Sequence, residues 1–135
     1  MRKFSTNSRA NAGIPVLVVG SSAKNGPSWL EGGAFAATPC LHAQDALKML
    51  SSDRYEAVLC DLDMQGTGSK KLMNIVCEDF PDIAVVAVTS QQRKGIMAMI
   101  AGASGYIQTP IQPELVADSL QSALTRKRLD AAVCR

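Results

Sequence analysis

Residues 56–61 read Glu56-Ala57-Val58-Leu59-Cys60-Asp61, an apolar run of strand length that ends on a carboxylate. Strong runs of the same kind lie at residues 15–19 and 83–88, with a short one at 105–108 and a weaker one at 34–37. A strand that is apolar at successive positions is buried on both faces, which is typical of a parallel sheet covered by helices on each side. The centre of the chain therefore predicts such a sheet.

The segments between these runs carry the spacing of amphipathic helices. Their apolar positions are Ala43, Ala46, Leu47 and Leu50; Leu72, Ile75 and Val76; Ile96, Met99 and Ile100; and Val116, Leu120, Ala123 and Leu124. Pro113 suits the first turn of the last helix, whose solvated end we expect at residues 125–128. Glycines and a proline in residues 21–34 leave room only for a short first helix around 28–31, where Trp29 is expected to fill the gap. The pattern predicts an α/β fold, a doubly wound, five-stranded parallel sheet in a flavodoxin-like three-layer sandwich with a shortened first helix.

Length and composition fit one globular domain. The chain has 135 residues, 47% of them hydrophobic and 19% charged, with a formal net charge of +2. We expect a flexible leader at 1–13, the domain at 14–128 and a tail at 129–135. The small net charge favours neither nucleic acid nor a membrane surface as partner, and no apolar run approaches the roughly 20 residues of a membrane span.

The four cysteines form no CxxC pair and stand at no metal-ligand spacing with His42, the one histidine. They are Cys40, Cys60, Cys77 and Cys134. Cys60 lies inside an apolar run and is interpreted as a small core residue. Free thiols of this kind favour a reducing, cytoplasmic compartment.

In open parallel sheets, functional residues gather at the carboxyl ends of the strands. Five residues that are far apart in the chain are therefore expected to converge there: Gly20, Ser21, Asp61, Thr89 and Thr109.

Four segments, taken in order, resemble the receiver domains of response regulators (CheY-like domains). They are Val58-Leu59-Cys60-Asp61-Leu62-Asp63-Met64-Gln65-Gly66, Val86-Ala87-Val88-Thr89-Ser90, Ala101-Gly102-Ala103-Ser104-Gly105-Tyr106-Ile107-Gln108-Thr109-Pro110, and Gln112-Pro113-Glu114-Leu115. The resemblance extends over about residues 15–124 and implies a module of two-component phosphorelay signalling. By it, Asp61 is the phosphoacceptor, Thr89 donates its hydroxyl to a phosphoryl oxygen, and Tyr106 changes rotamer as Thr89 moves.

The chain departs from the family's pattern where charge matters. Gly20-Ser21 stands where active receivers carry the acidic pair that holds Mg²⁺, Thr109 replaces the lysine that pairs with the phosphoryl group, and Gln65 replaces a turn proline. Asp61 and Asp63 remain as a weak or absent Mg²⁺ site, because the family uses the backbone carbonyl at position 63. Loss of metal and lysine together is expected to slow phosphoryl transfer about a thousandfold or more.

Three functions remain open. The leading hypothesis is an atypical, non-enzymatic receiver that acts by protein contact through residues 96–124. Its partner would be a histidine kinase, another signalling protein, or a second copy bound through the last two helices. The second is a slow but genuine phospho-accepting receiver. The third is a small flavodoxin-like enzyme or ligand-binding protein, which only the fold supports.

Overall fold

A computed structural model describes residues 13–20, 35–52, 54–63, 68–109 and 113–133. The predicted short first helix, Trp29, Ser21 and Gln65 lie outside these residues.

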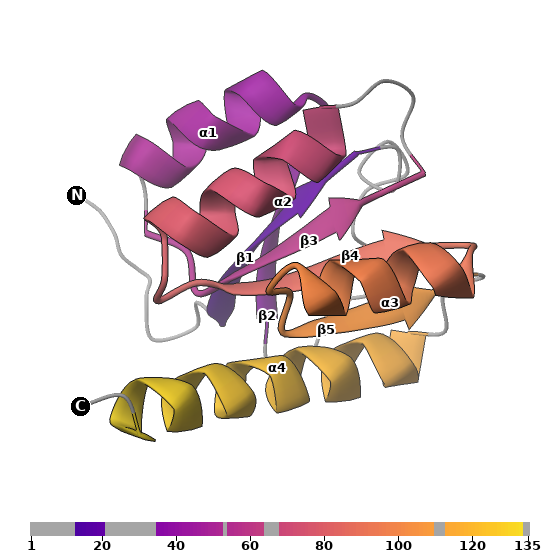
Figure 1. Cartoon of the computed structure of the whole chain (residues 1–135). Coiled ribbons are helices and arrows are strands. Elements are labelled where there is room, and N and C mark those ends of the chain that lie inside the picture. Colours follow the sequence, from indigo (N-terminus) through magenta and orange to yellow (C-terminus); the bar gives the residue numbers. More distant parts are fainter. Residues whose placement is uncertain (1–12, 21–34, 53, 64–67, 110–112, 134–135) are drawn as a thin grey trace.

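The described strands form one parallel sheet, as the sequence predicts (Figure 1). Its order is β2-β1-β3-β4-β5, and every neighbouring pair is parallel. The strands are β1 (Ile14–Val19), β2 (Phe35–Cys40), β3 (Ala57–Asp61), β4 (Ala84–Thr89) and β5 (Gly105–Gln108). The order reverses direction at β1, as in the doubly wound flavodoxin-like arrangement, so the predicted fold class is confirmed.

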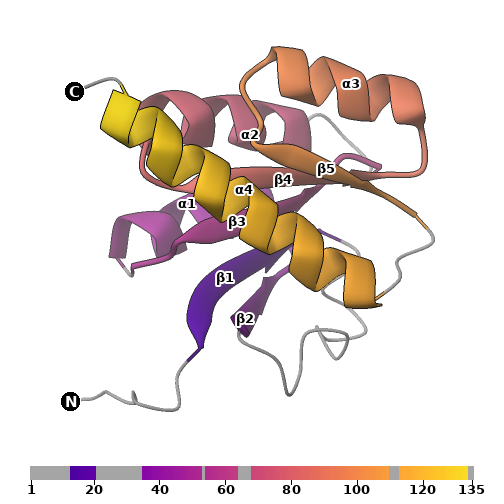
Figure 2. The same ribbon diagram turned by 90° about the horizontal axis from the view of Figure 1, so that it is seen from below.

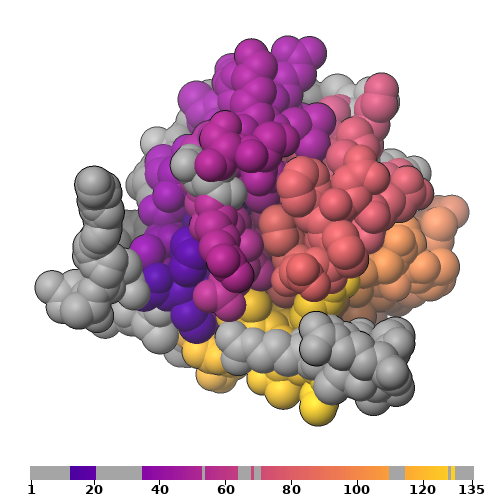
Figure 3. All heavy atoms as spheres, turned by 90° about the vertical axis from the view of Figure 1, so that its left-hand side faces the viewer, coloured from indigo at the N-terminus to yellow at the C-terminus, as the bar shows by residue number. Residues whose placement is uncertain are grey.

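Helices cover both faces of the sheet. They are α1 (Ala43–Ser52), α2 (Gly68–Asp79), α3 (Gln92–Ile100) and α4 (Pro113–Val133). The first three lie on one face and α4 on the other (Figures 1 and 2). Seen from the side, α1 and α2 pack side by side above, and the yellow α4 lies beneath (Figure 3). The result is three layers: helices, sheet and helix.

The alternation of side chains along the strands creates two cores. Leu17, Val58 and Val85 face the core shared with the first three helices. Their neighbours Leu59 and Val86 face the core shared with α4. Both faces of each central strand are therefore buried, which explains why these strands are apolar at every position.

Two element ends differ from the sequence-based expectation. Strand β2 continues through Pro39 to Cys40, which an apolar run does not signal; proline is tolerated there because β2 pairs only with β1 and is an edge strand. The predicted end of the last helix at 125–128 is wrong, because α4 continues to Val133. Arg126 is also more than a solvated charge, since its guanidinium donates a hydrogen bond to the Ser104 carbonyl (2.9 Å).

In the described part of the chain, no helix combines the length and apolar character that a bilayer crossing requires.

Candidate functional site

The predicted convergence at the carboxyl end of the sheet is present for the described residues. Asp61 pairs in register with Val88, one residue before Thr89. The Thr109 N–H donates to the Thr89 carbonyl (3.0 Å), so these two chain positions are also adjacent. Gly20 follows β1 directly and lies against Asp61. Chain segments about 90 residues apart therefore meet in one site.

Asp61 is enclosed by its surroundings. Only 5% of its surface is exposed, and its Oδ1 accepts a hydrogen bond from the Asp63 N–H (2.9 Å). Gly20 has a φ of +114°, and a Cβ built on it would lie 2.5 Å from the Asp61 Cβ. Two features of position 20 therefore favour glycine: the positive φ, and the lack of space for a Cβ beside Asp61. In this backbone no acidic side chain fits at the position where active receivers carry one.

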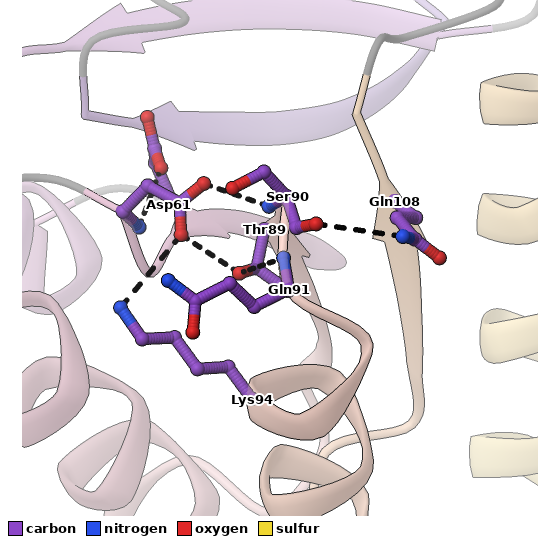
Figure 4. Close-up of polar contacts among 7 residues, drawn as sticks. Asp61, Thr89, Ser90, Gln91, Lys94 and Gln108 are labelled. Atoms are coloured by element: carbon purple, nitrogen blue, oxygen red, sulfur yellow. Dashed lines mark hydrogen bonds and ion pairs between the residues drawn. The ribbon is translucent and has the colours of Figure 1, made fainter.

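The Asp63 side chain binds polar groups at the end of β4. The Thr89 hydroxyl donates to Asp63 Oδ1 (2.7 Å), and the Ser90 N–H donates to Asp63 Oδ2 (2.7 Å). The Lys94 Nζ lies 3.9 Å from Asp63 Oδ1. Figure 4 shows Thr89, Ser90, Gln91 and Lys94 gathered at this point. Both carboxylate oxygens of Asp63 are thus engaged by donors from one short segment.

These contacts change the acidity of Asp63. Partial burial by itself would raise the pKa of this carboxyl, but the hydrogen bonds from Thr89 and Ser90, with the charge of Lys94, outweigh it. The pKa of Asp63 consequently lies below its ordinary value, and the group is a carboxylate at neutral pH.

The start of α3 depends on the same contacts. Its N-cap residue, Gln91, makes no side-chain capping bond, and the first turn contains no acidic residue. Instead, the Gln91 N–H donates to the Thr89 hydroxyl oxygen (3.1 Å) and the Ser90 N–H donates to Asp63. A carboxylate near a helix N-terminus is favoured by the helix dipole. Asp63 therefore supplies from a neighbouring loop the negative charge that α3 lacks.

Tyr106, the predicted switch residue, packs directly on Gly95 of α3. A Cβ at position 95 would lie 2.3 Å from Cδ2 and 2.5 Å from Cε2 of the ring. The ring is half-buried against the core on the side of the first three helices. Glycine at position 95 thus creates the slot in which Tyr106 sits.

Cys60, which precedes Asp61, lies in the core. It is fully buried, and burial, followed by the neighbouring Asp61 and Cys77, raises the pKa of its thiol to about 12. Its interpretation as a core residue is confirmed.

The residues present do not fit a Mg²⁺ ion. The ion requires oxygen ligands with negative charge among them, usually from carboxylates. Gly20 offers no side-chain ligand, and both oxygens of Asp63 already accept hydrogen bonds from Thr89 and Ser90. Among the described residues, no group of three or more His, Cys, Asp or Glu side chains is arranged so that it could hold a metal ion. The donor set therefore differs from that of a magnesium-dependent receiver.

Sequence reasoning missed the roles of the Asp63 side chain, Lys94 and Gly95. Asp63 was expected to offer only its backbone carbonyl, and Lys94 carries no motif. One signal was available: with Thr109 in place of lysine, the first cations that follow Thr89 in the sequence are Arg93 and Lys94. The glycine at 95, inside a predicted helix, also indicated a close contact.

Comparison with known proteins agrees with this geometry. A family model described as the response regulator receiver domain matches residues 12–121. The DNA-binding transcriptional regulator NtrC of Proteus hauseri is 28% identical over 89 residues, which cover 64% of this chain and 19% of that protein. The response regulator UvrY of Escherichia coli K12 is 24% identical over 91 residues, covering 66% of this chain and 42% of that protein. The chain thus spans less than half the length of either relative.

Solved structures of receiver domains share the fold. A CheY-like receiver domain from Methanospirillum hungatei superposes with a TM-score of 0.75 at 17% identity, covering 88% of this chain and 99% of that one. NtrX from Brucella abortus gives a TM-score of 0.79 at 19% identity, covering 90% of this chain and 29% of the other. The beryllofluoride-activated DrrB receiver domain gives 0.70 at 18% identity, covering 84% and 98%. With the family model and the topology in agreement, this chain belongs to the response regulator receiver domain family of two-component signalling.

Proposed function

We propose that this domain is an atypical receiver that signals by protein contact and does not depend on phosphorylation of Asp61. It would act in the cytoplasm, without catalysis and without Mg²⁺, on a histidine kinase, another signalling protein or a second copy of itself. Asp61 remains the candidate phosphoacceptor, with Thr89 and Tyr106 as the candidate switch residues.

The observation that carries this proposal is the contact between Gly20 and Asp61. Transfer of a phosphoryl group is mainly positioning and charge neutralisation, which in most enzymes of this chemistry includes metal ions and a cationic side chain. The position of the first metal-binding acid is a glycine whose missing Cβ makes room for the buried Asp61. Thr109 offers no charge at the position of the lysine. A phosphoryl group on Asp61 would therefore carry negative charge into a site with little compensation.

The surface of α3 and the start of α4 supports action by contact. Ile96, Met97 and Ile100 on α3 are 47%, 56% and 75% exposed, and Leu115 on α4 is 50% exposed. A pocket of about 340 Å³ is lined by Met99 of α3, Tyr106 of β5 and Leu115 of α4. We define the four exposed apolar residues as the α3–α4 face. Exposed apolar surface is typical of sites that bind other proteins, and this supports the proposal.

The proposal is tested by the intact mass of the full chain after incubation with acetyl phosphate and Mg²⁺. The wild type, an Asp61→Asn variant and an ordinary receiver domain are treated in parallel. We expect the ordinary receiver to gain the mass of one phosphoryl group, about 80 Da by formula, and this chain to gain none.

A gain of one phosphoryl group by the wild type that Asp61→Asn abolishes would instead establish a slow phospho-accepting receiver. A gain that persists in Asp61→Asn would place the modification elsewhere and leave the proposal intact. The family match gives no support to the third possibility, a small enzyme, since receiver domains are signalling modules.

A further inference from the structure

Asp63 binds an unusual set of donors for a side chain in a loop. Its Oδ1 accepts a hydrogen bond from the Thr89 hydroxyl and its Oδ2 accepts one from the Ser90 N–H, each with a donor–acceptor distance of 2.7 Å. The Lys94 ammonium group lies beside Oδ1. Hydrogen bonds to a carboxylate at this distance are short and charge-assisted, and about twice as strong as neutral ones. Thr89 is fully buried, so its hydroxyl requires a partner in the folded protein.

A phosphoryl group on Asp61 would need the same donors. It would be attached to the carboxylate two residues before Asp63, and Thr89 is the residue expected to donate its hydroxyl to it. Since Asp63 already accepts that hydroxyl and the next backbone N–H, an anion arriving on Asp61 has to displace the Asp63 carboxylate first.

We propose that the Asp63 carboxylate is a resident anion that takes the place of the phosphoryl group and holds the start of α3 in one arrangement. This inference rests on the proposed function, in which Asp61 is not phosphorylated. Asp63 is thus a positioning residue: it acts on the α3–α4 face through Thr89, Ser90 and α3, without touching a partner.

The path from Asp63 to that face is short and continuous. The carboxylate binds the last residue of β4 and the residue after it, and α3 begins two residues later at Gln92. One turn further, Gly95 forms the slot for Tyr106. The exposed Ile96 and Met97 follow on the same helix. A shift at the start of α3 would therefore move both the Tyr106 slot and the apolar face.

The charges also balance within the chain. The family's lysine is absent at Thr109, but Lys94 places an ammonium group 3.9 Å from the Asp63 carboxylate. This pair is partly exposed, and such ion pairs contribute little by themselves. Together with the helix dipole of α3, however, it gives one resident carboxylate the cationic surroundings that a phosphoryl group would otherwise require.

The test compares the full-length wild type with Asp63→Ala and Asp63→Asn by NMR, with no phosphoryl donor present. Asp82→Ala is the matched control, because it removes an exposed aspartate that lies on the turn between α2 and β4, away from Thr89 and Ser90 in the sequence. Two readouts are followed: hydrogen exchange of the Ser90 amide, and the nuclear Overhauser contact between the Tyr106 ring and the Gly95 α-protons.

In Asp63→Ala we expect exchange at Ser90 to accelerate about tenfold or more, because its acceptor is gone, and the Tyr106–Gly95 contact to weaken. Asp63→Asn keeps only one acceptor oxygen, so its effect should be intermediate, and Asp82→Ala should match the wild type. Unchanged Ser90 exchange in Asp63→Ala would overturn the inference. So would faster Ser90 exchange with an unaltered Tyr106–Gly95 contact, because Asp63 would then be only a local helix cap. Neither outcome bears on the mass measurement, so failure here is distinguishable from failure of the proposed function.

Discussion

Replacing Gly95 with alanine tests the contact between α3 and Tyr106. The added Cβ would lie 2.3, 2.5 and 2.7 Å from three atoms of the tyrosine ring. Carbon atoms in ordinary contact are about 3.5–4.0 Å apart, so the ring has to retreat by roughly 1 Å or more. Because the ring packs against the core, it cannot retreat without leaving its slot or displacing α3.

The size of the effect follows from two opposing terms. Overfilling a packed site costs about 1–3 kcal/mol, whereas alanine in place of glycine inside a helix contributes about 1 kcal/mol of stability. We therefore expect Gly95→Ala to lower the free energy of unfolding by up to about 2 kcal/mol. With Tyr106→Ala as the background, the ring is absent and only the helix-propensity gain remains. There the same substitution should raise stability by up to about 1 kcal/mol.

Urea unfolding followed by circular dichroism measures all four members of this cycle. The expected coupling energy between positions 95 and 106 is about 1–3 kcal/mol, the cost of overfilling the slot. If Gly95→Ala has the same effect with tyrosine and with alanine at position 106, the ring does not occupy the slot and the reasoning is refuted.

Three further predictions concern residues in and next to the candidate site. Gly20→Asp, although it restores an acid at the family's position, should destabilise the fold by about 1–3 kcal/mol in urea unfolding, because of the positive φ and the contact with Asp61. An equally large loss in Gly20→Ala would assign the effect to the Cβ and the backbone angle, since alanine lacks only the added carboxylate. A Gly20→Asp variant as stable as the wild type would contradict the prediction. The pKa of Asp63 is lowered in the folded state. The carboxylate therefore stabilises the fold above the ordinary aspartate pKa, and this stabilisation is lost as the pH falls through the lowered folded value. The difference in urea midpoint between the wild type and Asp63→Asn should accordingly narrow, and not widen, on acidification from pH 7. Burial raises the pKa of the Cys60 thiol to about 12. At neutral pH the thiol should therefore stay unlabelled by iodoacetamide in the native protein and react once urea unfolds the chain, as measured by peptide mass mapping. Rapid labelling of Cys60 in the native protein would contradict its place in the core.

The sequence was sufficient to predict the fold because its strongest signals are local. The continuous apolar strands that end at Asp61 and Thr89 can bury both of their faces only between two layers of helices. Strand β2 was less visible because it lies at the sheet edge and tolerates Thr38 and Pro39. The end of α4 was misplaced because the charged residues 125–128, typical of a helix end, are followed by further helix up to Val133.

The arrangement of the site was harder to predict, because it depends on contacts between distant segments. Positions such as Asp61 and Thr89 were placed correctly at the carboxyl ends of their strands. The bond between Asp63 and Thr89, however, joins residues 26 positions apart and depends on the loop that follows β3. The slot at Gly95 likewise depends on β5 packing beneath α3. No pattern within either segment alone indicates these contacts.

The central claim, that the start of α3 is set without phosphorylation, is tested most directly by adding beryllofluoride with Mg²⁺ to the wild-type chain. Beryllofluoride binds an aspartate carboxylate and has the tetrahedral shape of a phosphoryl group. Amide NMR spectra recorded through the titration should show no saturable change at Ser90, Tyr106 or residues 92–100, because Asp63 already holds their donors. Saturable shifts at these positions that disappear in Asp61→Asn would contradict the claim and show that Asp61 still operates the switch.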